Sequence, residues 1–145
     1  MTDTLKTDIY LAGRETETLF SDRSPVNIKN YRGDIILASG RENLAQSVIN
    51  RLFTRVGELS NIGHPDYGSR LYKIIGEPNS KRTRAFAEFY IREALSYENR
   101  VKKILDIITA PPAIEPARRN IMEITIVILI KEDDEPLTIS MDYNL

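Results

Sequence analysis

Cysteine is absent from this sequence of 145 residues, and histidine occurs once, as His64. A chain without cysteine forms neither a disulfide scaffold nor a thiolate metal site, and it is compatible with a reducing cytoplasm. His64 has no second histidine or cysteine with which to share a metal ion. The glycine spacing matches neither the Walker A motif nor the dinucleotide-binding motif. We therefore expect no metal and no cofactor.

An excess of one charge is also lacking, because 20 lysine and arginine residues oppose 21 aspartate and glutamate residues. Such a balance gives no overall field that would attract nucleic acid or an anionic membrane surface. We expect neither nucleic acid nor a membrane as a partner. A protein partner or a small substrate fits the composition better.

Long hydrophobic runs are missing as well. The longest, ITIVILI, is far too short to span a bilayer, and the N-terminal stretch lacks the apolar core of a signal peptide. The chain is expected to be soluble and not exported by that route. With 41% apolar residues, its length suits one ordinary domain.

Two stretches have the period of an amphipathic helix. Ser39 and Glu42 have the spacing of a capping box, and apolar residues then recur at intervals of three and four up to Gly57. This pattern predicts a helix over residues 40–54. A short helix is expected between Ser69 and Gly76.

A second main helix is predicted over about residues 80–97, capped by Asn79 or Ser80. Its first turns carry three cations, which oppose the positive end of the helix dipole. They form either a solvated helix end or a basic patch for an acidic partner. These cations are Lys81, Arg82 and Arg84. Apolar residues along one face of this helix are Phe86, Phe89, Tyr90, Ala94 and Tyr97.

Toward the C-terminus the period changes from 3.6 to 2, which predicts strands over 101–109, 121–130 and 137–143. Their short connections favour an antiparallel meander. We expect an α+β fold in which two long helices and one short helix pack on this three-stranded sheet. Residues 34–145 would form the domain, and residues 1–33 an extended arm. The sheet edges need a cover, which the helices, the arm or a strand of another chain can supply.

The motif His64-Pro65-Asp66-Tyr67-Gly68 brings together an imidazole, a carboxyl and a phenol. No nucleophile elbow or metal partner accompanies it. Proline fixes φ and glycine accepts φ > 0, so the motif is typical of a turn that positions other surfaces.

The segments NLAQSVINRLFTRVGELSNIGHPDYGSRLYKIIGE and REALSYENRVKKI resemble the baseplate wedge family of contractile phage tails, the GPW family. That family includes the corresponding subunits of type VI secretion systems and of extracellular contractile injection particles. The resemblance covers about residues 34–145. The Glu-Pro-Arg motif of the family stands here as Glu98-Asn99-Arg100, which keeps both charges and lacks the proline.

This resemblance implies a structural subunit, not an enzyme, that initiates the sheath at the baseplate. The implied partners are sheath subunits, the larger baseplate wedge proteins, and inner tube or hub proteins. Multiple copies would enter each baseplate, and the protein would be cytoplasmic during assembly and then part of the particle. Sheath strands extend the sheet of the family, and its Glu-x-Arg motif docks on the helical core of the wedge proteins.

Candidate binding residues follow from this implication. Glu98 and Arg100 either contact the wedge core through charge-assisted hydrogen bonds or form an internal ion pair that fixes the junction between helix and strand. The residues expected to pair with a sheath strand are Ile121, Thr125, Val127, Leu137, Thr138, Ile139, Ser140 and Met141.

Two other functions remain open. Members of the family have also been described as lysozymes, so a peptidoglycan-degrading glycoside hydrolase with Glu98 or Glu93 as its acid is the alternative. The acidic residues alone do not favour it, because 21 of them guarantee close pairs somewhere. A small adaptor domain unrelated to tails is the third possibility.

Overall fold

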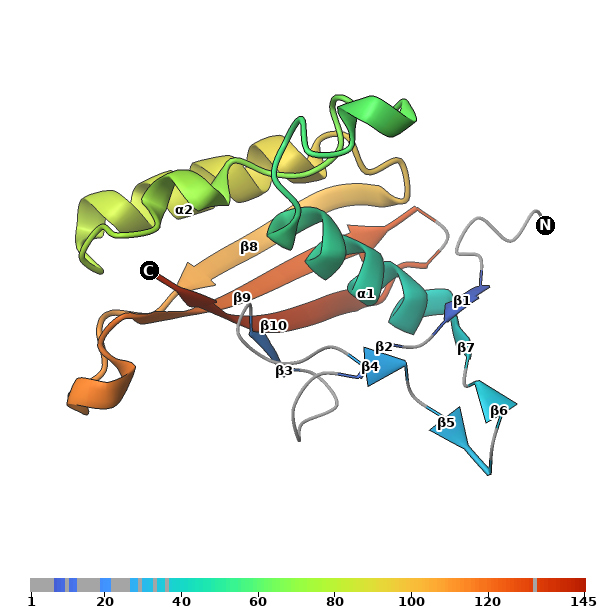
Figure 1. Ribbon diagram of the computed structural model, residues 1–145, viewed down its shortest axis with the longest axis horizontal. Coiled ribbons are helices and arrows are strands. Elements are labelled where there is room, and N and C mark those ends of the chain that lie inside the picture. The colour runs from blue at the N-terminus through green and yellow to red at the C-terminus, as the bar shows by residue number, and fades with distance from the viewer. Residues whose placement is uncertain are drawn as a thin grey trace.

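The computed structural model describes residues 7–9, 11–12, 19–21, 27–28, 30–32, 34–35, 37–131 and 133–145. Two α-helices lie on one face of a sheet, and the chain folds into two layers (Figure 1). Helix α1 spans Gly40–Phe53 and α2 spans Lys81–Leu95. The fold is α+β, as the sequence predicts.

The sheet contains four strands in the order β3-β10-β9-β8. Strands β8, β9 and β10 form the predicted antiparallel meander, and β3 adds to it in the parallel direction along β10. The expected sheet of three strands is therefore extended by a strand from the N-terminal region. The strands are β3 (Leu19–Ser21), β8 (Val101–Thr109), β9 (Ile121–Ile130) and β10 (Pro136–Asn144).

Short strand pairs precede α1. In the described residues they are β1 (Thr7–Ile9) with β7 (Leu37–Ser39), β2 (Leu11–Ala12) with β4 (Asn27–Ile28), and β5 (Asn30–Tyr31) with β6 (Asp34–Ile35). The side chain of Ser39 and the residues around β2 and β3 lie outside the described part, so the capping box and the course of the arm stay predictions.

In the described part of the chain, three 3-10 helices lie in the connections. The first is η1 (Ser60–Ile62) and the second is η2 (Leu71–Ile74), which stands where the sequence predicts a short helix. The third, η3 (Pro116–Arg118), lies in the connection between β8 and β9.

The core lies between the sheet and the two helices. The even-numbered residues of β9, from Met122 to Ile130, are all buried, and they face buried residues of α1 and α2. Alternation of apolar residues along β9 therefore identifies the core face correctly. The odd-numbered residues of β9 are half-buried or exposed on the opposite face.

The aromatic residues on the apolar face of α2 do not form its core contact. Phe86, Phe89 and Tyr97 are 41%, 60% and 59% exposed. The buried residues are instead Thr83, Ala87, Ile91, Ala94 and Leu95. The alanines let the helix approach β8 closely, whereas an aromatic ring at those positions would hold the two layers apart.

β8 forms where the sequence predicts a strand, but two β-bulges interrupt its alternation. The register against β9 shifts between Val101 and Lys103, and again between Ile104 and Asp106. Each bulge inserts one residue, so Val101, Ile104 and Ile107 point to the helices although they are three residues apart.

Candidate functional site

The predicted turn exists, and it lies beside the end of α1. The backbone N–H of Tyr67 donates to the carbonyl of His64 at 3.4 Å, which closes the turn with Pro65 at its second position. His64, Pro65 and Asp66 are exposed, Tyr67 is half-buried and Gly68 is buried.

Gly68 lets this segment pass close to the main chain that leaves α1. Its φ is 116°, and a Cβ at this position would lie 2.5 Å from the carbonyl oxygen of Thr54 and 2.9 Å from the nitrogen of Val56. Ser69 then forms two backbone hydrogen bonds with the same segment. Its N–H donates to the Thr54 carbonyl at 2.8 Å, and its carbonyl accepts from the Val56 N–H at 3.1 Å. Only glycine fits this crossing.

The crossing places Tyr67 against a buried ion pair at the end of α2. Arg100 forms a bidentate pair with Glu98, with Nε 2.8 Å from Oε1 and Nη2 3.0 Å from Oε2. Arg51 of α1 approaches Glu98 to 3.8 Å, and its guanidinium lies over the Tyr67 ring at 4.6 Å from the centroid. The cluster ties α1, the turn and the junction between α2 and β8 together.

The surroundings of Glu98 and Tyr67 in this cluster shift the pKa of each side chain. Burial opposes ionisation of Glu98, but the hydrogen bonds and charge of Arg100 outweigh it and hold the pKa of Glu98 below its ordinary value. Burial also raises the pKa of Tyr67, and the negative charge of Glu98 adds to this effect, although Arg51 opposes it. Glu98 is therefore an ionised carboxylate beside a neutral phenol.

This geometry supports the internal ion pair for Glu98 and Arg100. The Glu98 side chain is 7% exposed and that of Arg100 is 17% exposed. A general acid of a glycoside hydrolase needs a raised pKa, and the pKa of Glu98 is shifted in the opposite direction. Glu93, the other expected acid, forms an ion pair with Arg70.

Sequence reasoning missed Arg51. It precedes Leu52, which belongs to the apolar stripe of α1. Its role depends on contact with Glu98, which lies 47 positions further along the sequence. Only its position in the last turn of the helix, next to the apolar stripe, could have drawn attention to it.

The residues predicted to pair with a sheath strand occupy two different strands. β9 is the central strand of the meander, and both of its edges are paired within the chain. Thr125 and Val127 pair with both β8 and β10, which corrects the expectation that β9 receives another strand at these residues. Ile121 pairs with Asn144 of β10 and lies beyond the pairs with β8, which end at Ile124. The remaining candidates, residues 137–141, all lie on β10.

One part of the outer edge of β10 is covered. Ser140, Met141 and Asp142 pair with Leu19, Phe20 and Ser21 of β3. In the described chain, no strand pairs with the outer edge of Leu137, Thr138 or Ile139. Within the described residues, the first half of β10 therefore has an unpaired outer edge.

A second polar cluster, not predicted, lies at the other end of β10. Arg118 donates to Glu123 at 2.9 Å and to Asp142 at 3.3 Å. Burial raises the pKa of Asp142, and the charge of Arg118 opposes that shift. Arg118 and Asp142 are 24 residues apart, and no local pattern in the sequence links them.

The three cations at the start of α2 differ in their surroundings. Arg84 donates to the backbone carbonyl of Asn79 at 3.1 Å and to its side-chain oxygen at 3.0 Å, so Arg84 helps to fix the segment at which the helix begins. Arg82 lies over the Phe86 ring at 5.6 Å. Within the described residues, neither Lys81 nor Arg82 forms an ion pair.

No group of acidic or histidine side chains in the described residues could hold a metal ion. The helices of the same part of the chain are too short or too polar to cross a lipid bilayer.

Comparison with known proteins identifies a shared fold. A crystal structure of a candidate tail lysozyme from Geobacter sulfurreducens matches this chain with a TM-score of 0.64 and 22% sequence identity. The match covers 77% of this chain and 96% of the other. No protein family model and no curated protein sequence matches the chain.

Proposed function

We propose that this protein is a structural subunit of a contractile tail or injection particle, in which it initiates the sheath at the baseplate. The observation that carries the proposal is the half-covered outer edge of β10 in a fold shared with a candidate tail lysozyme. A strand of the first sheath ring pairs with this edge, and the pairing passes contraction of the baseplate to the sheath.

The opposite edge of the sheet is less suited to a partner strand. β8 carries two bulges, which bend and twist an edge, and two exposed lysines, Lys102 and Lys103. The N–H of Ile107 is bonded to the side chain of Asp106 at 2.8 Å. These features protect β8 from strand addition, so the partner strand binds at β10.

Proline substitution at the free stretch of β10 tests this function. Thr138 is exposed, and Thr138→Pro removes a backbone donor without opening the core, whereas Ile139 is 2% exposed and a change there would damage the fold. The control is Leu105→Pro, at a bulge on the opposite edge. Purified particles, baseplates and sheath would be counted by electron microscopy for each variant.

We expect Thr138→Pro to leave baseplates that lack sheath, and Leu105→Pro to assemble normally. Circular dichroism and thermal melting of each variant show whether the fold is retained. Normal sheath on baseplates that contain a folded Thr138→Pro protein would refute the strand-pairing role.

A peptidoglycan hydrolase is the second candidate, because the matching structure is described as a candidate tail lysozyme. Glu98 and Glu93 are both paired with arginines, which disfavours either as the acid. A turbidity assay on purified cell walls distinguishes the two functions. Clearing by the native protein that is lost in Glu98→Gln or Glu93→Gln would favour the enzyme.

A further inference from the structure

The outward face of α2 carries an ordered group of aromatic rings. Phe86 and Tyr90 are stacked with centroids 6.1 Å apart, and Phe89 meets Tyr90 edge-on at 5.7 Å. Phe86 and Phe89 are 41% and 60% exposed. Exposed apolar groups that are contiguous on a surface and fixed by mutual contact are typical of an interaction site.

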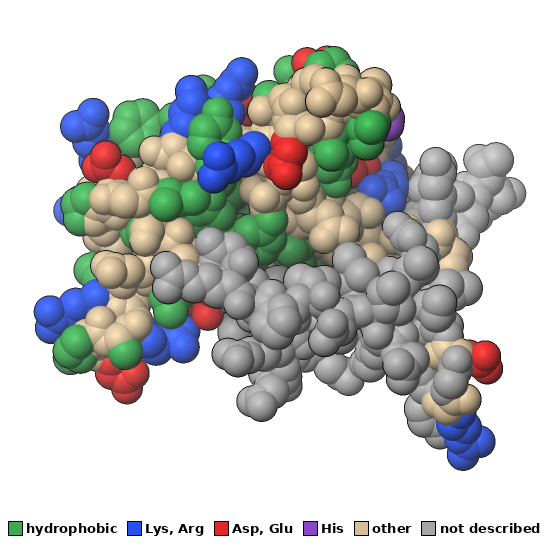
Figure 2. Space-filling view, in the orientation of Figure 1, with side chains coloured by type: hydrophobic (Ala, Val, Ile, Leu, Met, Phe, Trp, Pro, Cys, Tyr) green, Lys and Arg blue, Asp and Glu red, His purple; other side chains and the backbone are tan. Residues whose placement is uncertain are grey.

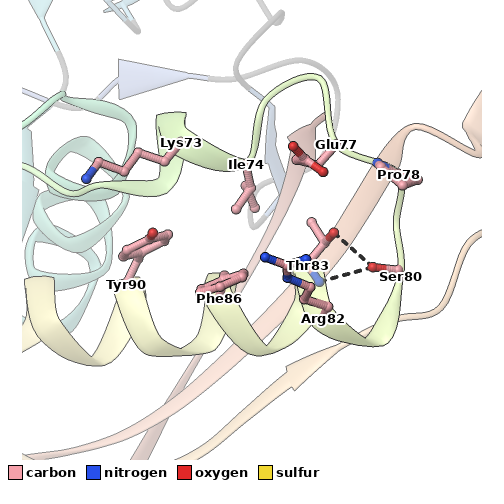
Figure 3. Close-up of a pocket in the computed structure, with 9 residues that line it drawn as sticks. All are labelled: Lys73, Ile74, Glu77, Pro78, Ser80, Arg82, Thr83, Phe86 and Tyr90. Carbon is pink, nitrogen blue, oxygen red and sulfur yellow. Dashed lines mark hydrogen bonds between the residues drawn. The ribbon is translucent and has the colours of Figure 1, made fainter.

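A groove lies between the rings of Phe86 and Tyr90 and the segment that precedes α2. It has a volume of about 350 Å³. Figure 3 shows Phe86 and Tyr90 on α2 facing the side of Ile74 and Lys73, with Pro78 and Ser80 beyond them. Ile74 and Pro78 give the opposite wall apolar surface, so the groove can hold an apolar side chain.

Cations surround this groove. Lys73 and Arg82 line it, and Lys81 precedes Arg82 on the exposed start of α2. None of the three forms an ion pair within the described residues. Glu77 is the one acidic residue in the lining. Figure 2 shows the mixture of basic and hydrophobic side chains over α2 and the segment before it.

The position of Lys81 and Arg82 is unfavourable for the isolated chain. The first turn of α2 holds no acidic residue, and cations there oppose the helix dipole. Ser80 caps the helix by accepting from the N–H of Thr83 at 3.2 Å, so the cations do not replace a missing cap. A carboxylate from outside the chain would compensate both the dipole and the unpaired cations.

We propose that this groove binds a segment of a partner protein that presents apolar side chains next to carboxylates. The apolar side chains enter between Ile74 and the rings of Phe86 and Tyr90, and the carboxylates pair with Lys73, Lys81 and Arg82. The site is separate from the edge of β10, so the inference does not depend on the proposed role in sheath assembly.

Two other occupants fit the groove less well. Single-stranded nucleic acid stacks on aromatic rings, but it needs a longer track of cations than three side chains, and Glu77 would repel its phosphates. A second copy that docked face to face would bring the same three cations together. The charge distribution therefore favours an acidic peptide segment.

Selection from a library of random peptides displayed on phage tests the inference with the full-length protein as target. Enriched peptides would be synthesised with a fluorescent label, and their affinity measured by anisotropy at low and high salt. We expect enrichment of peptides that combine aspartate or glutamate with aromatic or aliphatic residues, and weaker binding at high salt.

Variants then locate the binding site. Phe86→Ser and Arg82→Glu, which change two residues that line the groove, should each weaken the binding of the selected peptides by about tenfold or more. The matched controls are Ile114→Ser and Arg119→Glu, which change an exposed isoleucine and an exposed arginine in the connection between β8 and β9. Both controls should bind as the native protein does, and melting curves confirm that every variant is folded.

Several results would overturn the inference. These are enrichment of basic or uncharged peptides, equal loss of binding in the controls, and tighter binding of a labelled oligothymidine than of the selected peptides. Concentration-dependent dimerisation abolished by Phe86→Ser would instead assign the groove to a second copy of this chain.

Discussion

Gly68 is the residue on which the arrangement of the turn depends most directly. Gly68→Ala places a Cβ against backbone atoms of Thr54, Arg55 and Val56, which cannot move aside as a flexible side chain could. It also forces a residue other than glycine to φ 116°. We expect a loss of about 2–5 kcal/mol in the free energy of unfolding, measured by urea denaturation.

Gly63 provides the control for this substitution. Its φ is 88°, but a Cβ there would meet nothing within 4 Å. Gly63→Ala therefore reports the conformational cost alone, about 1–2 kcal/mol. Equal losses in the two variants would show that close approach at Gly68 contributes nothing.

Glu98 makes stability depend on pH in a defined direction. Its pKa in the folded protein is depressed, so its contribution is present above the pKa of the unfolded chain, about 4.3, and is lost as the pH falls through the folded pKa. At pH 7, Glu98→Gln should lower the free energy of unfolding by about 2–3 kcal/mol, because Arg51 and Arg100 lose their shared partner. The difference should shrink below about pH 4.3.

Glu88→Gln is the matched control, since Glu88 pairs with Arg92 on the exposed surface of α2. That pair should contribute less than about 0.5 kcal/mol at any pH. Urea denaturation of the three proteins across a pH series measures both effects. A difference between native protein and Glu98→Gln that is constant with pH would show that the charge of Glu98 is not its cause.

The two main helices and the strands of the meander could be located from the sequence, because each carries a sustained period and a clear start or stop. The face of α2 that packs on the sheet could not be predicted from the sequence. Phe86, Phe89 and Tyr90 form one apolar stripe, and Ala87, Ile91 and Ala94 form another. Only the distance between helix and sheet selects the stripe with the small residues.

The candidate site was predictable to a similar extent. The resemblance to the baseplate family singled out Glu98 and Arg100, and turn chemistry singled out the motif that contains Tyr67 and Gly68. Their convergence depends on contacts between residues distant in sequence, and Arg51 joins them only in three dimensions. The pairing of β3 with β10 likewise leaves no local periodic signal.

The bulge at Leu105 gives β8 an irregular edge, and its removal offers a test of that role. Deletion of Leu105 leaves Ile104 opposite Ile128 and Asp106 opposite Val127, so the faces of the strand are retained. The edge becomes more regular, and a regular edge is more prone to pair with another chain. We expect a folded protein that self-associates more strongly, measured by sedimentation velocity at increasing concentration.

A deletion in the central strand serves as the comparison. Removal of Val127 moves every following residue of β9 to the opposite face, so Ile128 and Ile130 would leave the core. That variant should fail to fold. A monomeric protein after deletion of Leu105, at concentrations where the native chain is also monomeric, would mean that the bulge does not protect the edge.

β3 links the N-terminal region to the sheet through backbone pairing with only three residues of β10. The buried apolar side chains that the structure describes lie within residues 44–143, where the sheet packs against α1 and α2. A chain that begins after residue 25 should therefore keep the spectrum and cooperative melting of the native protein. It should lose protection from amide hydrogen exchange at Ser140, Met141 and Asp142, while Ile124 and Ile126 of β9 stay protected.

Because a longer stretch of β10 would then be free, the shortened protein should also bind a sheath strand more tightly, if β3 competes with it for this edge. Unchanged exchange at Ser140–Asp142 would show that β3 does not cover β10 in solution, and the whole outer edge would then be open before any partner arrives.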